Sequence, residues 1–381
     1  MMQTGKEPDP INSIRHITDP TDPDRQWLVD YGKGNKPDAT AAEAALRFAR
    51  INDPNNARDI APYLARLDDL ADQVRSDLAA LLAKSGHDTV ASAKVAPDNN
   101  TLAPETLAQA SIEQIVSTLQ SVIPTRHGFQ GDAENYDDME NADLMKVMDR
   151  KRGLPVALAM LYIHVARRCD FTITGIDFPG HFLLRLQSNG KRRMIDPFHG
   201  GIALGPAELR ELLKSFSGLD AELEPRHYCE SSDVSILLRL QNNIKVRALR
   251  AGELTHATRI IEHSLLIAPD HEGLWHQLGA LYARLNEDHK ALGAFEQFVA
   301  LCEDPLHRTR IEAVIEELRD RLGLDVLCHT DGLTTTKAPA VTDDDSVKND
   351  AKDNAPIPLY PNLMSVTNTT NASDTPSSSD H

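Results

Sequence analysis

The sequence predicts an α+β protein in which helical segments flank a core with a small antiparallel sheet. Three observations support this prediction. Amphipathic helical patterns fill the first part of the chain, alternating or β-branched runs lie between residues 171 and 196, and a 34-residue repeat follows residue 240. The length of 381 residues is sufficient for two folded units.

The N-terminal part is predicted to be helical after an unstructured start. Residues 1–38 are rich in Pro, Asp and Gly, so we expect a disordered leader. Apolar residues at three- and four-residue steps predict helices from Ala41 and over residues 60–84. Residues 84–104 are polar and irregular, which predicts a loop insertion. Ser111 then precedes a further amphipathic run and is the expected N-cap of a helix.

The central part carries a pattern that changes from helix to strand. An apolar helix is predicted over residues 155–168, and strands are predicted in "FTITGID", "HFLLRLQ" and "RRMID". His181 opens the second of these strands and Asp196 closes the third. A His and an Asp on neighbouring strands are two of the three members of a nucleophilic triad.

The order of these elements is that of papain-like and transglutaminase-like sites, in which a Cys begins the helix and the helix dipole favours its thiolate. The segments "RKRGLPVALAMLYIHVARR", "GIDFPGHFLLRL" and "MIDPFHGG" resemble the SirB1-type transglutaminase-like family. The resemblance covers roughly residues 41 to 325 without the insertion, and it implies a transglutaminase-like domain over residues 39–235. It also implies that His181 is the equivalent of the catalytic histidine and Asp196 that of its orienting aspartate.

The nucleophile that this layout requires is missing from the sequence. No Cys, Ser or Thr occurs from Gly153 to Ala159. Cys169 lies at the far end of the same helix, about 20 Å away at 1.5 Å per residue. Nothing local indicates that Cys229 folds back to the site. We therefore expect no catalysis by a cysteine thiol.

Each candidate residue also has a structural interpretation. His181 is either a histidine that joins two strands through Asp196 or part of a retained pocket. Asp196, which precedes Pro197, also fits the commoner role of a turn residue at a strand end. His199 is expected in an exposed loop. His181, Asp196 and His199 together could bind a metal, but no HxH or HExxH spacing accompanies them, so we expect neither metal nor cofactor.

Basic and acidic residues flank the predicted helix start. Arg150 and Arg152 are candidate binding residues that would line the rim of a cleft and attract an acidic peptide or small anion. The alternative is that both are solvated surface residues. The acidic stretch "DAENYDDMEN" is either a loop packed over the site or a solvated linker.

The C-terminal region from 236 to 325 is predicted to form tetratricopeptide-like helical repeats. At a spacing of 34 residues, Ile244 matches Leu278 and Ala257 matches Ala291. Trp275 and Tyr282 are either core residues or contacts to a partner on the concave surface of the repeats. Residues 330–381 are rich in Ser, Thr, Asp, Asn and Pro, which predicts a disordered tail.

The net charge, the cysteine spacing and the missing nucleophile narrow the range of functions that the sequence predicts. The net charge of −17 argues against nucleic acid and membrane surfaces as partners. Four widely spaced cysteines and the lack of a signal peptide predict a cytoplasmic protein. We favour a pseudoenzyme, a non-catalytic regulatory protein that binds a protein or peptide through its cleft or repeats, and the family resemblance suggests a bacterial one. The alternative is an amide hydrolase or acyltransferase with His181 as general base and Asp196 orienting it.

Overall fold

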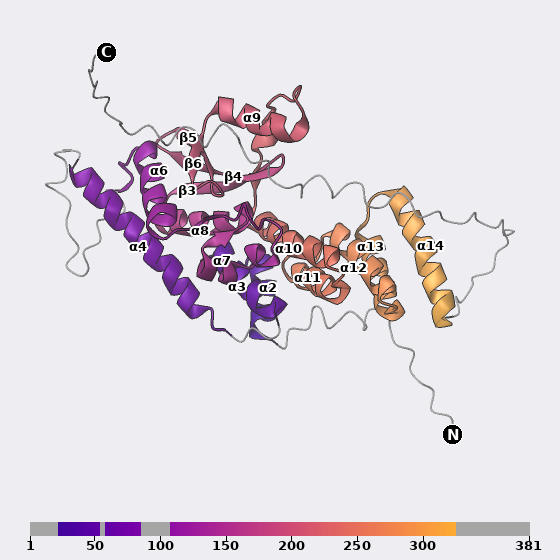
Figure 1. Cartoon of the computed structure of the whole chain (residues 1–381). Coiled ribbons are helices and arrows are strands. Elements are labelled where there is room, and N and C mark those ends of the chain that lie inside the picture. Colours follow the sequence, from indigo (N-terminus) through magenta and orange to yellow (C-terminus); the bar gives the residue numbers. More distant parts are fainter. Residues whose placement is uncertain (1–21, 54–57, 85–106, 325–381) are drawn as a thin grey trace, which may run out of the picture.

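The computed structural model describes residues 22–53, 58–84 and 107–324. Figure 1 shows a core of helices and one larger sheet, from which the C-terminal helices extend to one side. This arrangement confirms the predicted α+β class. The helices that precede the sheet are α2 (Pro23–Gly32), α3 (Ala41–Asn52), α4 (Ala61–Lys84), α6 (Ile112–Gln120), the π-helix η2 (Ser121–Arg126), the 3₁₀ helix η3 (Met139–Ala142), α7 (Leu144–Arg150) and α8 (Pro155–Arg168).

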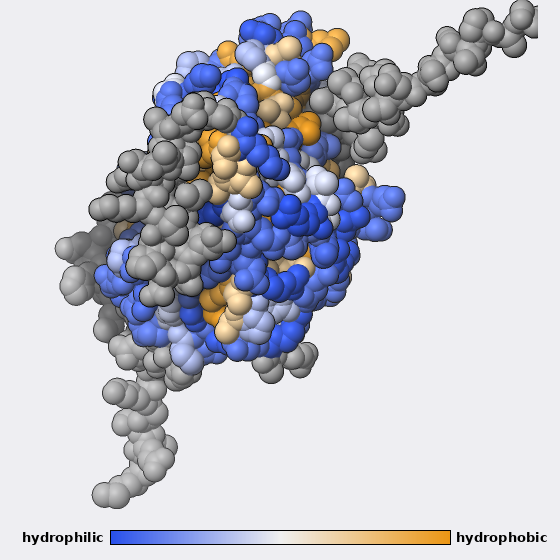
Figure 2. Space-filling model, turned by 90° about the vertical axis from the view of Figure 1, so that its left-hand side faces the viewer, coloured by the Kyte–Doolittle hydropathy of each residue, from blue (hydrophilic) through white to orange (hydrophobic). Residues whose placement is uncertain are grey.

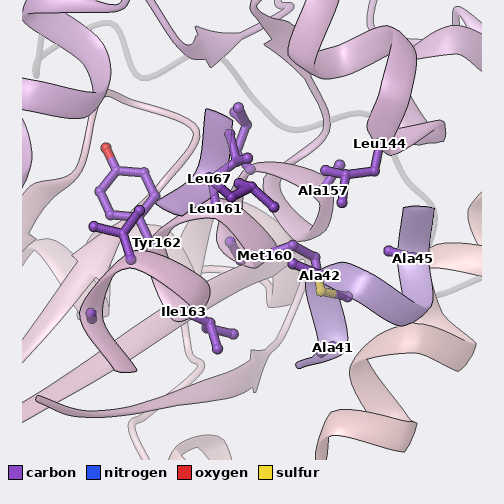
Figure 3. Close-up of a cluster of buried hydrophobic side chains, with 14 of the residues drawn as sticks. Ala41, Ala42, Ala45, Leu67, Leu144, Ala157, Met160, Leu161, Tyr162 and Ile163 are labelled. Carbon is purple, nitrogen blue, oxygen red and sulfur yellow. The ribbon is translucent and has the colours of Figure 1, made fainter. Parts of the chain in front are cut away.

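Helix α8 lies at the centre of the core because it is apolar on every side. All residues from Pro155 to Ala166 are buried, as is typical of a helix surrounded by other elements. In Figure 3, Met160 of α8 lies beside Ala42 of α3, and Ala157 lies beside Leu144 of α7. The small alanine side chains of α3 let that helix approach α8 closely.

The main sheet has five antiparallel strands in the order β6-β5-β4-β3-β7. The three predicted strands are confirmed as β3, β4 and β5. The short strands β6 and β7 were not predicted, because two or three residues are too few to show an alternating pattern. A separate parallel pair joins β1 (Gln130–Gly131) and β2 (Arg152–Gly153). The strands of the main sheet are β3 (Thr172–Phe178), β4 (His181–Ser188), β5 (Lys191–Asp196), β6 (Ile202–Leu204) and β7 (Glu230–Ser231).

The two faces of this sheet contribute to different clusters. Leu184 and Ile195 belong to the main core with α8, whereas Leu183 and Met194 belong to a smaller cluster with α9 (Pro206–Ser217). Figure 1 shows α8 and α9 on opposite sides of the sheet. A 3₁₀ helix, η4 (Pro225–Tyr228), then leads into β7.

The C-terminal helices form antiparallel pairs, as the repeat pattern predicted. Helix α10 joins both regions, because Leu237 and Leu240 belong to the main core and Ala248 to the core of the repeats. It therefore continues across the predicted boundary at residue 235. These helices are α10 (Asp233–Arg250), α11 (Leu254–Ile267), α12 (Glu272–Arg284), α13 (Asp288–Leu301) and α14 (Pro305–Leu322).

The two aromatic residues of α12 are core residues. Trp275 is buried and its indole Nε1 donates to the carbonyl of Pro269 at 2.7 Å. Tyr282 is buried and its hydroxyl donates to Glu262 at 2.5 Å. The prediction that they contact a partner is therefore wrong, because both are covered by the repeats themselves.

The predicted disordered leader is wrong for residues 23–32, which form α2. Asp22 caps this helix by accepting the N–H of Asp24 at 2.7 Å, and Pro23 is favourable in the first turn. Leu28 is fully buried, and the buried carboxylate of Asp24 accepts from Arg47 at 2.6 Å. Residues 1–21, 85–104 of the insertion and the tail at 330–381 lie outside the described residues.

The surface seen in Figure 2 is mostly hydrophilic, with hydrophobic residues in small separate areas. Within the described ranges, none of the helices combines the length and apolar character needed to cross a membrane.

Candidate functional site

His181 and Asp196 meet at the end of the main sheet. A tight turn joins β3 to β4, so that Phe178 pairs directly with His181. Gly180 in this turn has a φ of +69°, and a Cβ at this position would collide with the ring of Phe216. His181 Nε2 lies 2.9 Å from Asp196 Oδ2, and the exposed fractions of the two side chains are 0% and 1%.

Asp196 is held by four hydrogen bonds. Its Oδ1 accepts the backbone N–H groups of Phe198 at 2.9 Å and His199 at 3.3 Å. Its Oδ2 accepts from the rings of His181 and His199, the latter at 2.7 Å. Burial alone raises the pKa of Asp196, but the two histidines outweigh burial and hold that pKa well below its usual range. Asp196 is thus both a turn residue and the partner of His181.

His199 is not the exposed loop residue that was predicted. Its side chain is 21% exposed, because the turn after β5 folds back and brings Nδ1 onto the Asp196 carboxylate. The rings of His181 and His199 lie nearly parallel, with centroids 6.0 Å apart. An ionised Asp196 only accepts hydrogen bonds, so His181 Nε2 and His199 Nδ1 both carry a hydrogen.

His181 Nδ1, the other ring nitrogen, has no hydrogen-bond partner among the described residues. His181 is 2% exposed, so the protein covers almost the whole residue. An unpaired buried polar atom is costly and marks a place where a ligand, a water or strain is expected.

A cavity of about 20 Å³ lies beside His181. This volume suits a single water molecule. At the first turn of α8, Leu154 makes no side-chain cap and Pro155 has no N–H. The cavity is lined by Leu154, Pro155, Val156, His181, Tyr136, Gly180, Phe182, Arg239 and Asn243.

None of the cysteines that the structure describes lines this cavity. Cys169 lies at the opposite end of α8, where its thiol donates to the Ala71 carbonyl at 3.4 Å and burial raises its pKa to about 11. Cys302 is buried in the repeats, and Cys229 is exposed before β7. A thiolate nucleophile requires a lowered pKa and proximity to the base, and Cys169 has neither.

His181, Asp196 and His199 also form the one cluster of potential metal ligands found among the described residues, with ligand atoms within 4.8 Å of one another. The contacts of 2.7 and 2.9 Å are ordinary hydrogen-bond lengths. A metal-bound imidazole usually has its second nitrogen held by a partner, whereas His181 Nδ1 has none. The geometry therefore favours a carboxylate bridging two imidazoles over a metal centre.

Arg150 and Arg152 do not line the cavity, contrary to the predicted position at its rim. Arg150 forms ion pairs with Asp138 at 2.9 Å and Glu140 at 3.0 Å. Arg152 donates to the carbonyl of Gly128 at 3.1 Å. Both arginines are therefore engaged in holding neighbouring segments of the chain.

The acidic stretch 132–141 packs over the site, which decides between its two interpretations. Tyr136 lines the cavity, and its ring contacts that of Phe198 with centroids 6.0 Å apart. Arg247 of α10 donates to the carbonyls of Tyr136 at 2.9 Å and Asp137 at 3.2 Å. The segment thus connects the site to the first helix of the repeats.

Sequence reasoning missed Tyr136, Arg239 and Asn243. Arg239 pairs with Asp177, and its guanidinium lies 5.6 Å from the centre of the Phe182 ring. The available signal was the spacing of Arg239, Asn243 and Arg247, which places three polar residues on one face of α10.

Comparison with known proteins matches two regions of the chain. Residues 61–242 match the transglutaminase-like superfamily and residues 244–316 a tetratricopeptide repeat. A UPF0162 protein of Vibrio cholerae is 31% identical over 192 residues, covering 49% of this chain and 71% of that protein. A UPF0162 protein of Pseudomonas aeruginosa is 32% identical over 201 residues, covering 51% and 71%. Protein SirB1 of Salmonella typhimurium is 27% identical over 208 residues, covering 52% and 77%. No solved structure matches.

Proposed function

The chain belongs to the SirB1-type family of transglutaminase-like proteins with tetratricopeptide repeats, and on that premise we propose that it binds a protein or peptide partner without converting it. The start of α8 is the observation that carries this proposal. Buried Leu154, Pro155 and Val156 occupy the position where a transglutaminase-like enzyme needs its nucleophile. Within the described ranges, the His181–Asp196 pair then has no thiol to activate.

The partner binds where the repeats meet the core. A cavity of about 340 Å³ opens there, which is within the size range of ligand sites and lies at the kind of junction where such sites concentrate. Ile244 and Met139 supply apolar surface, Arg259 and Lys146 supply positive charge, and Asp143 supplies negative charge. Tetratricopeptide arrays commonly hold peptides, which supports a protein partner.

The test is chemical crosslinking of the full chain in cell extract, followed by identification of the crosslinked residues. We expect Arg259→Ala to reduce the yield of the partner crosslinked at Lys146. Arg284→Ala is the matched control, because Arg284 is an exposed residue of α12 that does not line the cavity. His181→Gln should retain the partner. Equal yields from the Arg259 and Arg284 variants would contradict binding at this junction.

An acyl-cleaving enzyme is the second candidate, and the unpartnered His181 Nδ1 favours it. In that reaction Nδ1 takes a proton from a water or substrate hydroxyl while its oxygen attacks an acyl carbon, and the proton passes to the leaving group. The measurement is hydrolysis of p-nitrophenyl acetate. Turnover that His181→Gln abolishes in a folded protein would establish this candidate, and equal rates for both proteins would dismiss it.

We also place the protein in the bacterial cytoplasm, in a regulatory role. The relatives are bacterial, and the cysteines form no spacing typical of disulfide frameworks. A protein that binds its partner without converting it regulates that partner by occupying it. Fractionation of the native cells tests the location, and recovery in the periplasm would contradict it.

A further inference from the structure

A second, larger cleft lies on the side of the sheet that faces α9. It has a volume of about 710 Å³ and is separate from the cavity at His181. Buried Met194, Leu204 and Leu209 form an apolar floor. Three arginines and one glutamate supply the charged lining, namely Arg185, Arg192, Arg193 and Glu208.

One hydrogen-bond donor of the Arg185 side chain has no partner among the described residues, although this side chain is only 13% exposed. It forms an ion pair with Glu230 and donates through Nη1 to the Tyr228 carbonyl at 3.2 Å. Its Nε is buried and has no partner among the described residues. Burial lowers the pKa of Arg185, and the charge of Arg192 lowers it further.

The charged residues of the cleft differ in how they are paired, and Arg185 already forms an ion pair with Glu230. Arg192 is exposed and forms no ion pair within the part of the chain that the structure describes. The carboxylate of Glu208 accepts the N–H of Gly205 at the start of α9 and adds one negative charge to the lining. Arg193 pairs with Glu113 at 2.8 Å. Arg192 is therefore the one arginine of the lining without an ion pair among the described residues, and it lies beside an apolar floor with the unpartnered Nε of Arg185.

Part of the edge of β5 beside these arginines is not paired with another strand among the described residues. Strand β6 pairs only with Met194–Asp196, so residues 191–193 of β5 have no strand neighbour on that side among the described residues. Basic residues often guard such an edge against aggregation. That function would explain Arg192 and Arg193, but it explains neither the buried, unpartnered Nε of Arg185 nor the apolar floor.

We propose that this cleft binds an extended acidic peptide segment of a partner protein. Its carboxylates pair with Arg185 and Arg192, an apolar side chain contacts Met194 and Leu204, and its backbone lies along the open edge of β5. The apolar floor favours a peptide over an inorganic anion. The net charge of −17 disfavours nucleic acid. The surface is distinct from the junction cavity at Arg259.

The probe is a fluorescein-labelled synthetic peptide in which aspartate alternates with leucine, and the measurement is fluorescence anisotropy with the full chain. We expect the peptide to bind and its counterpart with asparagine in place of aspartate to bind much more weakly. Arg192→Glu should weaken binding by roughly tenfold or more. Arg210→Glu is the matched control, because Arg210 is exposed on α9 outside the cleft lining, and it should change affinity less than about twofold.

Four results would overturn the proposal: no binding by the unaltered chain, equal binding of the asparagine peptide, equal losses in the Arg192 and Arg210 variants, or tighter binding of a single-stranded oligonucleotide of the same charge. Circular dichroism checks that Arg192→Glu remains folded. Arg185→Met, with that same check, should also lose binding. Arg259→Ala should bind the peptide normally, so failure here is distinguishable from failure at the junction cavity.

Discussion

The transglutaminase-like core and the helical repeats both bury polar side chains, but the examples below differ in whether these side chains have hydrogen-bond partners. In the repeats, Trp275 and Tyr282 each donate to an acceptor of the same region. In the core, His181 Nδ1 and the hydroxyl of Tyr162 are buried without a partner among the described residues. Figure 3 shows the Tyr162 hydroxyl pointing away from the other labelled side chains.

This difference separates structural polar groups from candidate functional ones. A buried polar group with its hydrogen bonds complete stabilises one arrangement and needs nothing further. A buried group without a hydrogen-bond partner destabilises the folded state. Such a cost is expected at a functional site, where the group can bind a ligand, and is not expected in a purely structural part of the protein. His181 combines both cases, because Nε2 is bonded to Asp196 and Nδ1 has no partner among the described residues.

The largest expected effect comes from removing the carboxylate at the centre of the core site. Asp196→Ala leaves two imidazole N–H groups and two backbone N–H groups without their acceptor. We expect the free energy of unfolding to fall by about 3–5 kcal/mol, as for other broken buried pairs. Urea denaturation measures this change.

Asp220→Ala is the control for this loss. Asp220 is exposed and should change the free energy of unfolding by less than about 0.5 kcal/mol. If both variants lose equally little, the Asp196 network is not part of what stabilises the core.

Two buried tyrosines test the comparison more sharply. Tyr282→Phe removes a hydrogen bond to Glu262 and should lower the free energy of unfolding by about 1.5 kcal/mol or more. Tyr162→Phe removes a hydroxyl without a described partner and should be neutral within about 0.5 kcal/mol, or stabilising. Thermal and urea unfolding of the two variants side by side provide the measurement. A loss in Tyr162→Phe equal to that in Tyr282→Phe would mean that the Tyr162 hydroxyl is bonded in solution.

Local patterns in the sequence were sufficient to predict much of the framework. The apolar run over residues 155–168 matches α8 at both ends, and Ser111 caps α6 as predicted, in a capping box with Gln114. These features depend on neighbours within a few residues, where periodicity and capping act. The pairing of His181 with Asp196 was also predicted, because antiparallel neighbours bring the start of one strand to the end of the next.

The remaining features depend on contacts between distant segments. Tyr136 lines the cavity, and Arg247, more than a hundred residues later, donates to its backbone carbonyl. Helix α2 is stabilised by Arg47 of α3, so its Pro- and Asp-rich start gave a misleading prediction of disorder. The unpartnered nitrogen of Arg185 is likewise a property of packing, because it depends on the segments that cover this side chain.

The last prediction concerns the contact between the repeats and the N-terminal helices. His263 of α11 bonds through Nδ1 to Asn52 at 2.7 Å and through Nε2 to Arg25 at 3.0 Å. Arg25 can only donate, so Nε2 must be the unprotonated nitrogen and the ring neutral. Burial first, and then the charge of Arg25, lowers the pKa of His263 to about 3.

The lowered pKa makes this contact sensitive to acid. His263 has the ordinary pKa of 6.5 in the unfolded chain and a pKa of about 3 in the folded chain. As the pH falls below 6.5, the unfolded chain therefore binds a proton that the folded chain does not bind. The contribution of His263 to stability is fully present above pH 6.5 and is lost as the pH falls towards 3. His263 alone should remove about 1 kcal/mol between pH 6.5 and 5.5. His127, His164 and His276 also have lowered pKa values and act in the same direction. His263→Gln should therefore reduce the slope of unfolding free energy against pH without abolishing it. An unchanged slope would mean that His263 is already protonated in the folded protein and that Arg25 bonds elsewhere.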